Sequence, residues 1–227
     1  MLSVYADYPY NINRADVRKL LVLYQYGGVF ADLDVESLRP IDDLLYKYQC
    51  IIAQEPEEHQ SLIYEYKHKH YVMSALMACR PKHPFLKFVI DLLPQYADRA
   101  LTLSWNDNIL KSTGPMFLAE VLDLYINSNA YNGTAEEHVY LAPPEWFMPT
   151  YDKVNMETYY TKCSDLDKLH FKQRIVCEKL LSRKYKNVVS ESAYTNHHWL
   201  HTWGDTFVPK GHVSIEQVMS NFTKLDS

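Results

Sequence analysis

The sequence predicts a single α/β domain of 227 residues, in which short apolar strands alternate with amphipathic helices. Three observations support this class. An amphipathic helix, a glycine pair and a short apolar strand follow one another between Arg14 and Ile41. The segments Cys50–Gln54 and Tyr71–Pro81 are apolar and have the length of buried strands. The run HPFLKFVIDLL after the second segment has the apolar spacing of a helix and carries Pro84 in its first turn.

The composition argues against several classes of protein. A formal net charge of −5 is opposite to the basic surplus of most nucleic-acid-binding domains. No segment approaches 18 consecutive apolar residues, and the N-terminus lacks the basic and apolar regions of a signal peptide. The four cysteines form no C-x-x-C pair, so a zinc site is not expected. Disulfides are expected only if the chain reaches an oxidising compartment.

The stretch from Arg14 to Ile41 is predicted to organise the domain. Asp16 is expected to cap or begin its helix, because a short carboxylate accepts hydrogen bonds from free N–H groups of a first turn. The pair Gly27-Gly28 is expected to end it, since glycine adopts the left-handed conformation of helix C-termini. The apolar residues 29–31 that follow predict a buried strand of the sheet.

Three carboxylates follow this strand at alternate positions: Asp32, Asp34 and Glu36. Because residues i and i+2 of an extended chain face the same side, we expect the three side chains to converge. Oxygen ligands of this kind suit Mg²⁺ or Mn²⁺. The alternative is an acidic surface loop, because an isolated D-x-D is common.

The run RADVRKLLVLYQYGGVFADLDVE resembles the signature of glycosyltransferase family 32, the "DXD sugar-binding region" group, which includes yeast-type α-1,6-mannosyltransferases and inositol-phosphoceramide mannosyltransferases. The matching features are R-A-D, L-x-x-Y-G-G, an aromatic residue and D-L-D. The sequence departs from the pattern at Lys19, where arginine is expected, with Arg18 one place earlier. The resemblance implies a GT-A-like, Rossmann-type fold that apparently lacks its first strand–helix unit, with an N-terminal segment missing.

The tail sequence YTNHHWLHTW is similar to the H-H-W-x-x-S-W ending of related transferases. Its matching residues are His197, His198, Trp199 and Trp203, with Thr202 in place of the usual serine. Histidine is a good ligand for a Mn²⁺-like ion. We therefore expect Asp34 and a histidine to hold Mn²⁺ or Mg²⁺, with His198 preferred and His197 next.

The resemblance also implies contacts with a nucleotide-sugar donor. Thr113-Gly114-Pro115 is similar to a T-G-P turn of the family that opens a helix, and small residues near Ser74 are expected close to the sugar. The residues expected to contact the donor are Arg14, Asp16, Arg18, Lys19, Gly28, Asp32, Ser74, Gly114 and Trp203.

The remaining segments give fewer indications. Glu55, Glu58 and His59 follow a predicted strand and are expected at the rim of the ligand crevice, although solvated loop charges are at least as good an interpretation for Glu57 and Glu58. Residues 139–149 predict a late strand and a proline-rich turn. Residues 152–187 are polar, rich in lysine and partly helical, which is typical of a variable insertion within the one domain, 1–227.

Together, these observations predict a metal-dependent retaining glycosyltransferase that uses Asp32 and Asp34 and transfers mannose from GDP-mannose to a glycan or sphingolipid. A Golgi or secretory-pathway location is expected, with no membrane span in this chain. Alternatives are a UDP-sugar transferase for galactose or N-acetylglucosamine, and a catalytically inactive domain that binds sugar nucleotides or glycans. A carboxylate-metal phosphate ester hydrolase would need a further Asp or His cluster, and the sequence shows none.

Overall fold

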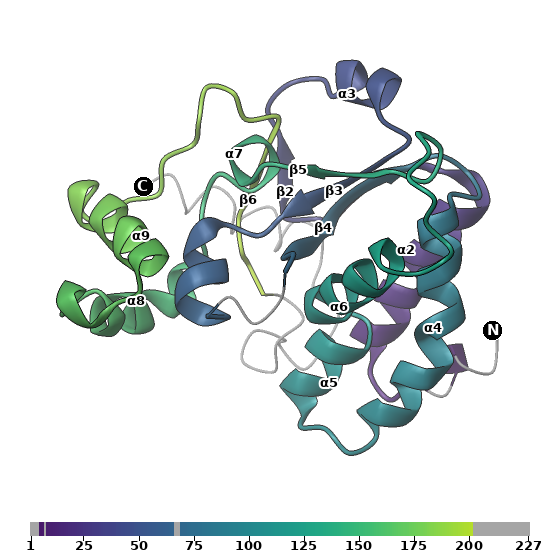
Figure 1. Ribbon diagram of the computed structural model, residues 1–227, viewed down its shortest axis with the longest axis horizontal. Helices are drawn as coiled ribbons and strands as arrows, with labels where there is room; N and C mark the ends of the chain where they lie inside the picture. The colour runs from purple at the N-terminus through teal and green to yellow at the C-terminus, as the bar shows by residue number, and fades with distance from the viewer. Residues whose placement is uncertain (1–4, 7, 66–68, 202–227) are drawn as a thin grey trace, which may run out of the picture.

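The computed structural model describes residues 5, 6, 8–65 and 69–201 (Figure 1), and its α/β class agrees with the prediction. Within these residues a four-stranded sheet has the order β1-β4-β3-β5, and β2 pairs with β6 in a separate two-stranded ribbon. The strands are β1 (Gly28–Ala31), β2 (Val35–Ser37), β3 (Cys50–Gln54), β4 (Val72–Cys79), β5 (Val139–Ala142) and β6 (Thr195–His197).

The sheet is mixed rather than fully parallel. β4 runs antiparallel to both of its neighbours, β1 and β3, whereas β3 and β5 are parallel. The register therefore brings the C-terminal ends of β1, β3 and β5 together with the N-terminal end of β4. These strand ends form one edge of the sheet, which runs across the strands. A mixed sheet covered by helices is consistent with the expected GT-A-like fold, and the edge just described carries the loops that line the site.

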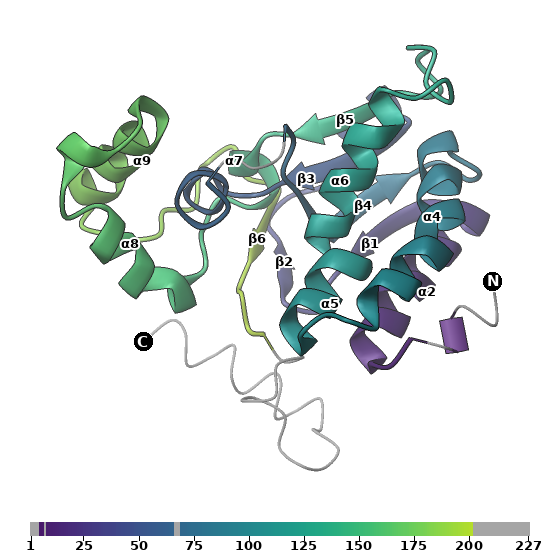
Figure 2. The same cartoon turned by 60° about the horizontal axis from the view of Figure 1, so that its bottom comes forward.

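One face of the sheet is covered by a helical layer, seen in Figure 2 on the side of α2, α4, α5 and α6. Alternating strand residues such as Ile52 and Met77 point into this layer and pack against Leu20, Leu86 and Phe117, all of which are buried. Burying such side chains contributes roughly 1.5–3 kcal/mol each. The helices are α2 (Asn11–Tyr26), α4 (Pro84–Ala100), α5 (Trp105–Ser112) and α6 (Pro115–Ile126).

The opposite face packs against shorter elements. Ile51 and Leu76, one position away from the residues that face the helical layer, contact Phe147 and Tyr194 in a second core cluster. The helices on this side are α3 (Asp42–Lys47) and α7 (Pro144–Phe147). The two clusters show that the central strands are buried on both faces, as their continuous apolar sequences predict.

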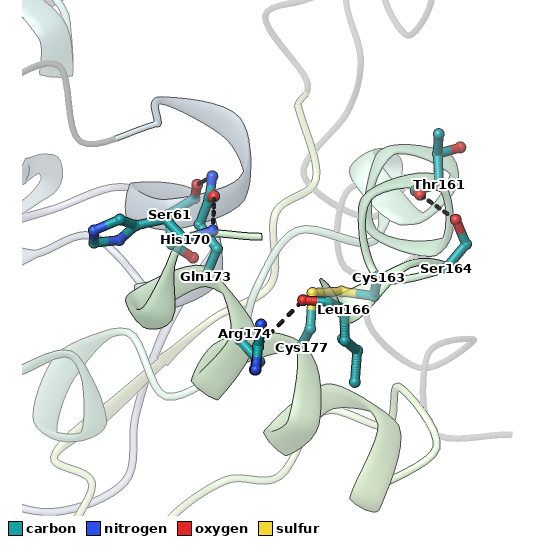
Figure 3. The surroundings of a disulfide bond; sticks show 9 residues. All are labelled: Ser61, Thr161, Cys163, Ser164, Leu166, His170, Gln173, Arg174 and Cys177. Atoms are coloured by element: carbon teal, nitrogen blue, oxygen red, sulfur yellow. Dashed lines mark hydrogen bonds between the residues drawn. A yellow bond between two sulfur atoms is a disulfide. The ribbon is translucent and has the colours of Figure 1, made fainter. Parts of the chain in front are cut away.

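A third region lies at the far side of the β2–β6 ribbon from the helical layer (Figure 2). It is helical, as predicted for residues 152–187, and a disulfide joins Cys163 to Cys177 (Figure 3). Gln173 Nε2 donates a hydrogen bond to Ser61 O at 3.0 Å, which joins the disulfide-linked helices to the short helix after β3 within this region. Its elements are η1 (His59–Ile63), η2 (Lys153–Asn155), α8 (Met156–Lys162), η3 (Leu166–Lys168) and α9 (Phe171–Ser182).

Two details of the first stretch differ from the sequence prediction. The helix begins at Asn11, so Asp16 lies inside α2 and is not its cap. β1 is an edge strand with exposed residues, because only β4 pairs with it. The predicted helix end is correct: Gly27 has φ 68°, and a Cβ there would lie 2.5 Å from Cδ of Pro81, so both the backbone and the close packing require glycine.

The cysteines resolve a question that the sequence left open. Cys50 and Cys79 form a second disulfide between directly paired residues of β3 and β4, so the four cysteines, all of them described, are paired. No helix in 5–65 or 69–201 is long and apolar enough to span a bilayer.

Candidate active site

Asp32, Asp34 and His197 meet at the edge of the sheet, where one possible ligand atom from each lies within 4.8 Å of the others. Asp32 directly follows β1, and its N–H donates to Ala75 O at 2.8 Å, which continues the pairing with β4. His197 ends β6, and the pairing of Val35 with His197 brings it beside the start of β2. The acidic strand end therefore meets one imidazole of the tail, that of His197.

Asp34 is the most firmly held of the three residues. His197 Nε2 lies 3.2 Å from its Oδ1, and the Leu200 N–H donates to its Oδ2 at 3.0 Å. Its carbonyl oxygen accepts the N–H of His198 at 2.9 Å. Burial raises the pKa of Asp34, but the hydrogen bonds from His197 and Leu200 outweigh burial and leave the pKa below its ordinary value. Asp34 is therefore a carboxylate at neutral pH.

Asp32 has the opposite electrostatic setting. Its pKa is raised to about 6, chiefly by burial; the positive charge of Lys19 acts against this rise and the negative charge of Asp34 adds to it. Two partly buried carboxylates in contact with one imidazole form a site that favours added positive charge.

The residues present suit a divalent cation. The ring nitrogen of His197 that faces Asp34 is Nε2, while Nδ1 is buried and has no hydrogen-bond partner in the described part of the chain. A donor set of two carboxylates and one imidazole matches Mn²⁺ better than Mg²⁺, which prefers oxygen ligands and water.

The structure reverses the expected order of the two histidines. His197 joins the aspartates, whereas the Nε2 of His198 lies 3.1 Å from Glu36 Oε2 on the more exposed side of the ribbon. Successive side chains of an extended segment alternate between faces, so only one of two adjacent histidines can point at Asp34. Glu36 is likewise outside the group that it was expected to complete.

Asp16 and Lys19 lie in a buried polar network beside Asp32. Lys19 Nζ is 2.7 Å from Asp16 Oδ1, and both side chains are less than a tenth exposed. The Thr113 hydroxyl donates to Asp16 Oδ2 at 2.9 Å and accepts from Asn13 Nδ2 at 3.1 Å. Thus Lys19, rather than Arg18, occupies the position near the site, and the network links α2 to the start of α6.

Three of the expected donor contacts lie elsewhere. Arg14 binds the backbone of Tyr8 and Asn11 Oδ1, and Arg18 donates to the Tyr5 hydroxyl at 2.7 Å, so both arginines hold the segment before α2. Gly28 is at the opposite end of β1 from Asp32 and lines a different groove, of about 350 Å³. Sequence spacing alone did not show which side of α2 the arginines occupy.

The other three expected donor contacts have different outcomes. Ser74 is buried in β4, next to Ala75, whose carbonyl oxygen accepts the Asp32 N–H; its contact with a donor stays a prediction. Gly114 precedes α6, where a Cβ would lie 2.8 Å from Ile109 O, so contact with α5 is sufficient to require glycine there. Trp203 lies outside the described residues.

A second polar network next to the site was not predicted. Glu55 and His59, expected at an exposed rim, are 2% and 4% exposed and pair through Oε2 and Nδ1 at 2.8 Å. His59 Nε2 accepts the N–H of Asp152 at 3.1 Å, and Asp152 Oδ2 lies 2.8 Å from His201 Nε2. Glu58 is also buried and pairs with Arg183.

One sequence signal was available for this network. Glu55 and His59 are four residues apart at the start of a helical segment, a spacing at which side chains meet. Asp152 and His201 had no comparable signal, because their contact joins segments far apart in the chain.

Comparison with known proteins supports the resemblance on which these expectations rest. Residues 1–51 match the family model described as a glycosyltransferase sugar-binding region containing a DXD motif. Inositol phosphoceramide mannosyltransferase 3 of Schizosaccharomyces pombe is 31% identical over 150 residues, which are 64% of this chain and 36% of that protein. Mannosyl phosphorylinositol ceramide synthase CSH1 of Saccharomyces cerevisiae is 30% identical over 60% of this chain and 31% of that protein.

These matches confirm the family resemblance, and the chain spans about a third of the length of these relatives. The family-model match includes Asp16, Lys19, Asp32 and Asp34 but does not extend to His197. Among solved structures, PaToxG glycosyltransferase aligns with 81% of this chain and 54% of its own at 16% identity, with a TM-score of 0.34. A likeness at that level supports no argument about the site.

Proposed function

We propose that this chain, whose residues 1–51 match the glycosyltransferase sugar-binding region containing a DXD motif, transfers a sugar from a nucleotide-sugar donor in a reaction that depends on a divalent cation. The observation that carries the proposal is the meeting of Asp32, Asp34 and His197 at one edge of the sheet. Asp34 and His197 would hold the cation, preferably Mn²⁺. Asp32 would face the cation or the hydroxyl groups of the donor.

The roles of the protein groups follow from their surroundings. Asp34 is held in its ionised form by His197 and by the Leu200 N–H, so it would offer a negative charge to the cation. Lys19 places a buried positive charge beside Asp32, near the expected position of the donor. When bound, a divalent cation supplies Lewis-acid stabilisation of the charge that develops on the departing diphosphate.

The donor and acceptor are proposed from the names of the relatives. They are inositol phosphoceramide mannosyltransferases and a mannosyl phosphorylinositol ceramide synthase, so mannose is the favoured sugar and a sphingolipid the favoured acceptor. By the same resemblance the donor is GDP-mannose and the configuration at the anomeric carbon is retained. The two disulfides support a location in the oxidising secretory pathway, of which the Golgi lumen is the favoured part.

The test is a donor screen with the purified chain. Hydrolysis of GDP-mannose, UDP-galactose and UDP-N-acetylglucosamine is measured with Mn²⁺, with Mg²⁺ and with excess chelator. We expect Mn²⁺-dependent turnover, with GDP-mannose preferred, and loss of that turnover in Asp34→Ala. Asp91→Ala, which removes an exposed carboxylate of α4, is the matched control and should retain the wild-type rate.

Each outcome separates the candidate functions. A preference for either UDP-sugar would replace the mannose assignment but keep the reaction class. Calorimetric binding of GDP and Mn²⁺ without any turnover would identify a binding domain instead of an enzyme. Undiminished turnover in Asp34→Ala or in excess chelator would refute the role of the cation.

A further inference from the structure

The segment Trp199–His201 wraps around Asp34 in an uncommon backbone conformation. Trp199 has φ 56° and His201 has φ 48°, a region that costs bulky residues roughly 1 kcal/mol or more each. Leu200, between them, donates the N–H that Asp34 Oδ2 accepts at 3.0 Å. Surrounding contacts must therefore keep this segment in place for Asp34 to retain its hydrogen bond.

The first of these contacts is the pair of His201 and Asp152, whose Nε2 and Oδ2 are 2.8 Å apart. The Asp152 side chain is only 7% exposed, and its Oδ1 accepts the N–H of Val154 at 2.9 Å. The carboxylate is thus fixed to the backbone on one side and holds the imidazole on the other.

A second layer fixes Asp152 in turn. The Asp152 N–H donates to His59 Nε2, so that nitrogen carries a lone pair and the ring proton is on Nδ1, which faces the Glu55 carboxylate. The ring of Trp199 contacts the His59 ring with 4.8 Å between centroids and the His197 ring with 4.2 Å. The buried pair of Glu55 and His59 therefore supports Asp152, just before η2. It also supports the Trp199 ring, which packs on His197.

We propose that Asp152 is a positioning residue: its pair with His201, backed by Glu55 and His59, holds Trp199–His201 so that Asp34 and His197 keep a geometry that binds a divalent cation. Asp152 is not among the residues that meet at the cation cluster. It acts through His201 and Leu200. This inference rests on the proposed cation site, but its structural part can be tested without any cation.

The first experiment measures hydrogen exchange of the Leu200 amide in the metal-free protein. Removing the imidazole in His201→Ala leaves the Asp152 cap of Val154 intact, and we expect exchange at least tenfold faster, which is about 1.4 kcal/mol of lost protection. His201→Gln keeps an N–H donor at the end of the side chain and should restore protection. Asp152→Asn is a second variant that keeps an oxygen for the cap and should accelerate exchange as well.

The matched control is another His–Asp pair in the helical layer. Asp123 Oδ1 lies 2.6 Å from His70 Nδ1, and both side chains are 23% exposed. Asp123→Asn should leave the Leu200 amide unchanged. Unchanged exchange in both His201→Ala and Asp152→Asn, or an equal acceleration in Asp123→Asn, would overturn the positioning role.

The second experiment titrates the same variants with Mn²⁺ in a calorimeter. Changes to groups that orient metal ligands commonly weaken affinity about 10–100-fold, and we expect that loss in His201→Ala, with rescue in His201→Gln and an unaltered melting temperature. Equal Mn²⁺ affinity in all variants would overturn the link to the cation. If the wild type binds no Mn²⁺ while Leu200 still responds, the proposed function fails and the positioning role stands.

Discussion

The two sides of the candidate site are built in different ways. Asp32 ends a strand of the main sheet and lies beside a network drawn largely from α2, within the same short stretch of sequence. Asp34, two residues later, belongs to the β2–β6 ribbon and takes its hydrogen bond from Leu200, 166 residues further along the chain. The surroundings of Asp32 are therefore built from residues close to it in the sequence. Those of Asp34 need a hydrogen bond from a segment near the end of the described chain.

The difference in surroundings gives the two carboxylates different charge behaviour. Burial raises the pKa of Asp32 to about 6, whereas hydrogen bonds from the tail leave the pKa of Asp34 below its ordinary value. Pairs of titratable groups whose surroundings move their pKa values apart are typical of sites where each member has its own role. Here the comparison favours Asp34 as the permanent anion of the site and Asp32 as the group that responds to what binds.

The largest expected effect concerns the sheet side. Lys19→Met removes the partner of the buried Asp16 carboxylate, and breaking a buried pair in this way costs about 3–5 kcal/mol of unfolding free energy. The double variant Lys19→Met/Asp16→Asn should recover much of the loss, because no uncompensated charge remains. Urea unfolding measures both. If Lys19→Met is as stable as the wild type, the pair of Lys19 and Asp16 does not stabilise the fold around Asp32.

The next effect concerns the region beyond the ribbon. Replacing Cys163 and Cys177 by serine opens a loop with a sequence separation of 14 residues, which lowers stability by about 3 kcal/mol in the loop-entropy model. Thermal unfolding under non-reducing conditions measures the loss, with Ser164→Ala as the control. A melting temperature equal to that of the wild type would mean that packing alone holds α8 and α9 together.

A smaller effect distinguishes the two adjacent histidines of the ribbon side. His197→Ala should weaken Mn²⁺ binding about 100-fold, or roughly 2.7 kcal/mol, since it removes a ligand. His198→Ala, whose side chain meets Glu36 instead, should change the affinity by less than about threefold, on the order of 0.6 kcal/mol. Calorimetric titration compares them directly, and the reverse ranking would restore the order expected from the sequence.

The last prediction is a pH dependence of stability that comes from His83, the residue before α4 in the helical layer. Burial lowers the pKa of His83 from 6.5 to about 4, so between these values the unfolded chain takes up a proton that the folded chain does not. The contribution to stability is therefore complete above about pH 6.5 and is lost as the pH falls toward 4. His83→Asn keeps an acceptor for the Phe85 N–H and should show a shallower fall in melting temperature over this window. Identical slopes would contradict the assignment.

The local side of the site was largely predictable from sequence. The D-x-D after a short strand, the helix before it and the glycine turn all depend on neighbours a few residues away, and the structure contains each of them. The tail motif correctly indicated a histidine beside Asp34. It did not select His197 over His198, because a one-residue difference in strand register exchanges the two faces.

The non-local parts were not predictable in the same way. Glu55 and His59 were expected at the rim of a crevice, but both are buried, and Asp152 and Trp199 from distant segments contact His59. Arg14 and Arg18 were expected to contact the donor, yet they bind Tyr8 and Tyr5 of the segment before the helix. Whether a polar residue is buried depends on tertiary contacts that local periodicity does not encode.

The antiparallel pairing of β2 with β6 has a consequence for biosynthesis. Residues near position 36 obtain their strand partner only after about 195 residues have been made, so a nascent chain completes its sheet core before it can close the ribbon. Contacts of such long range form late in folding. The three side chains that would hold a cation therefore come together only once nearly the whole described chain has folded.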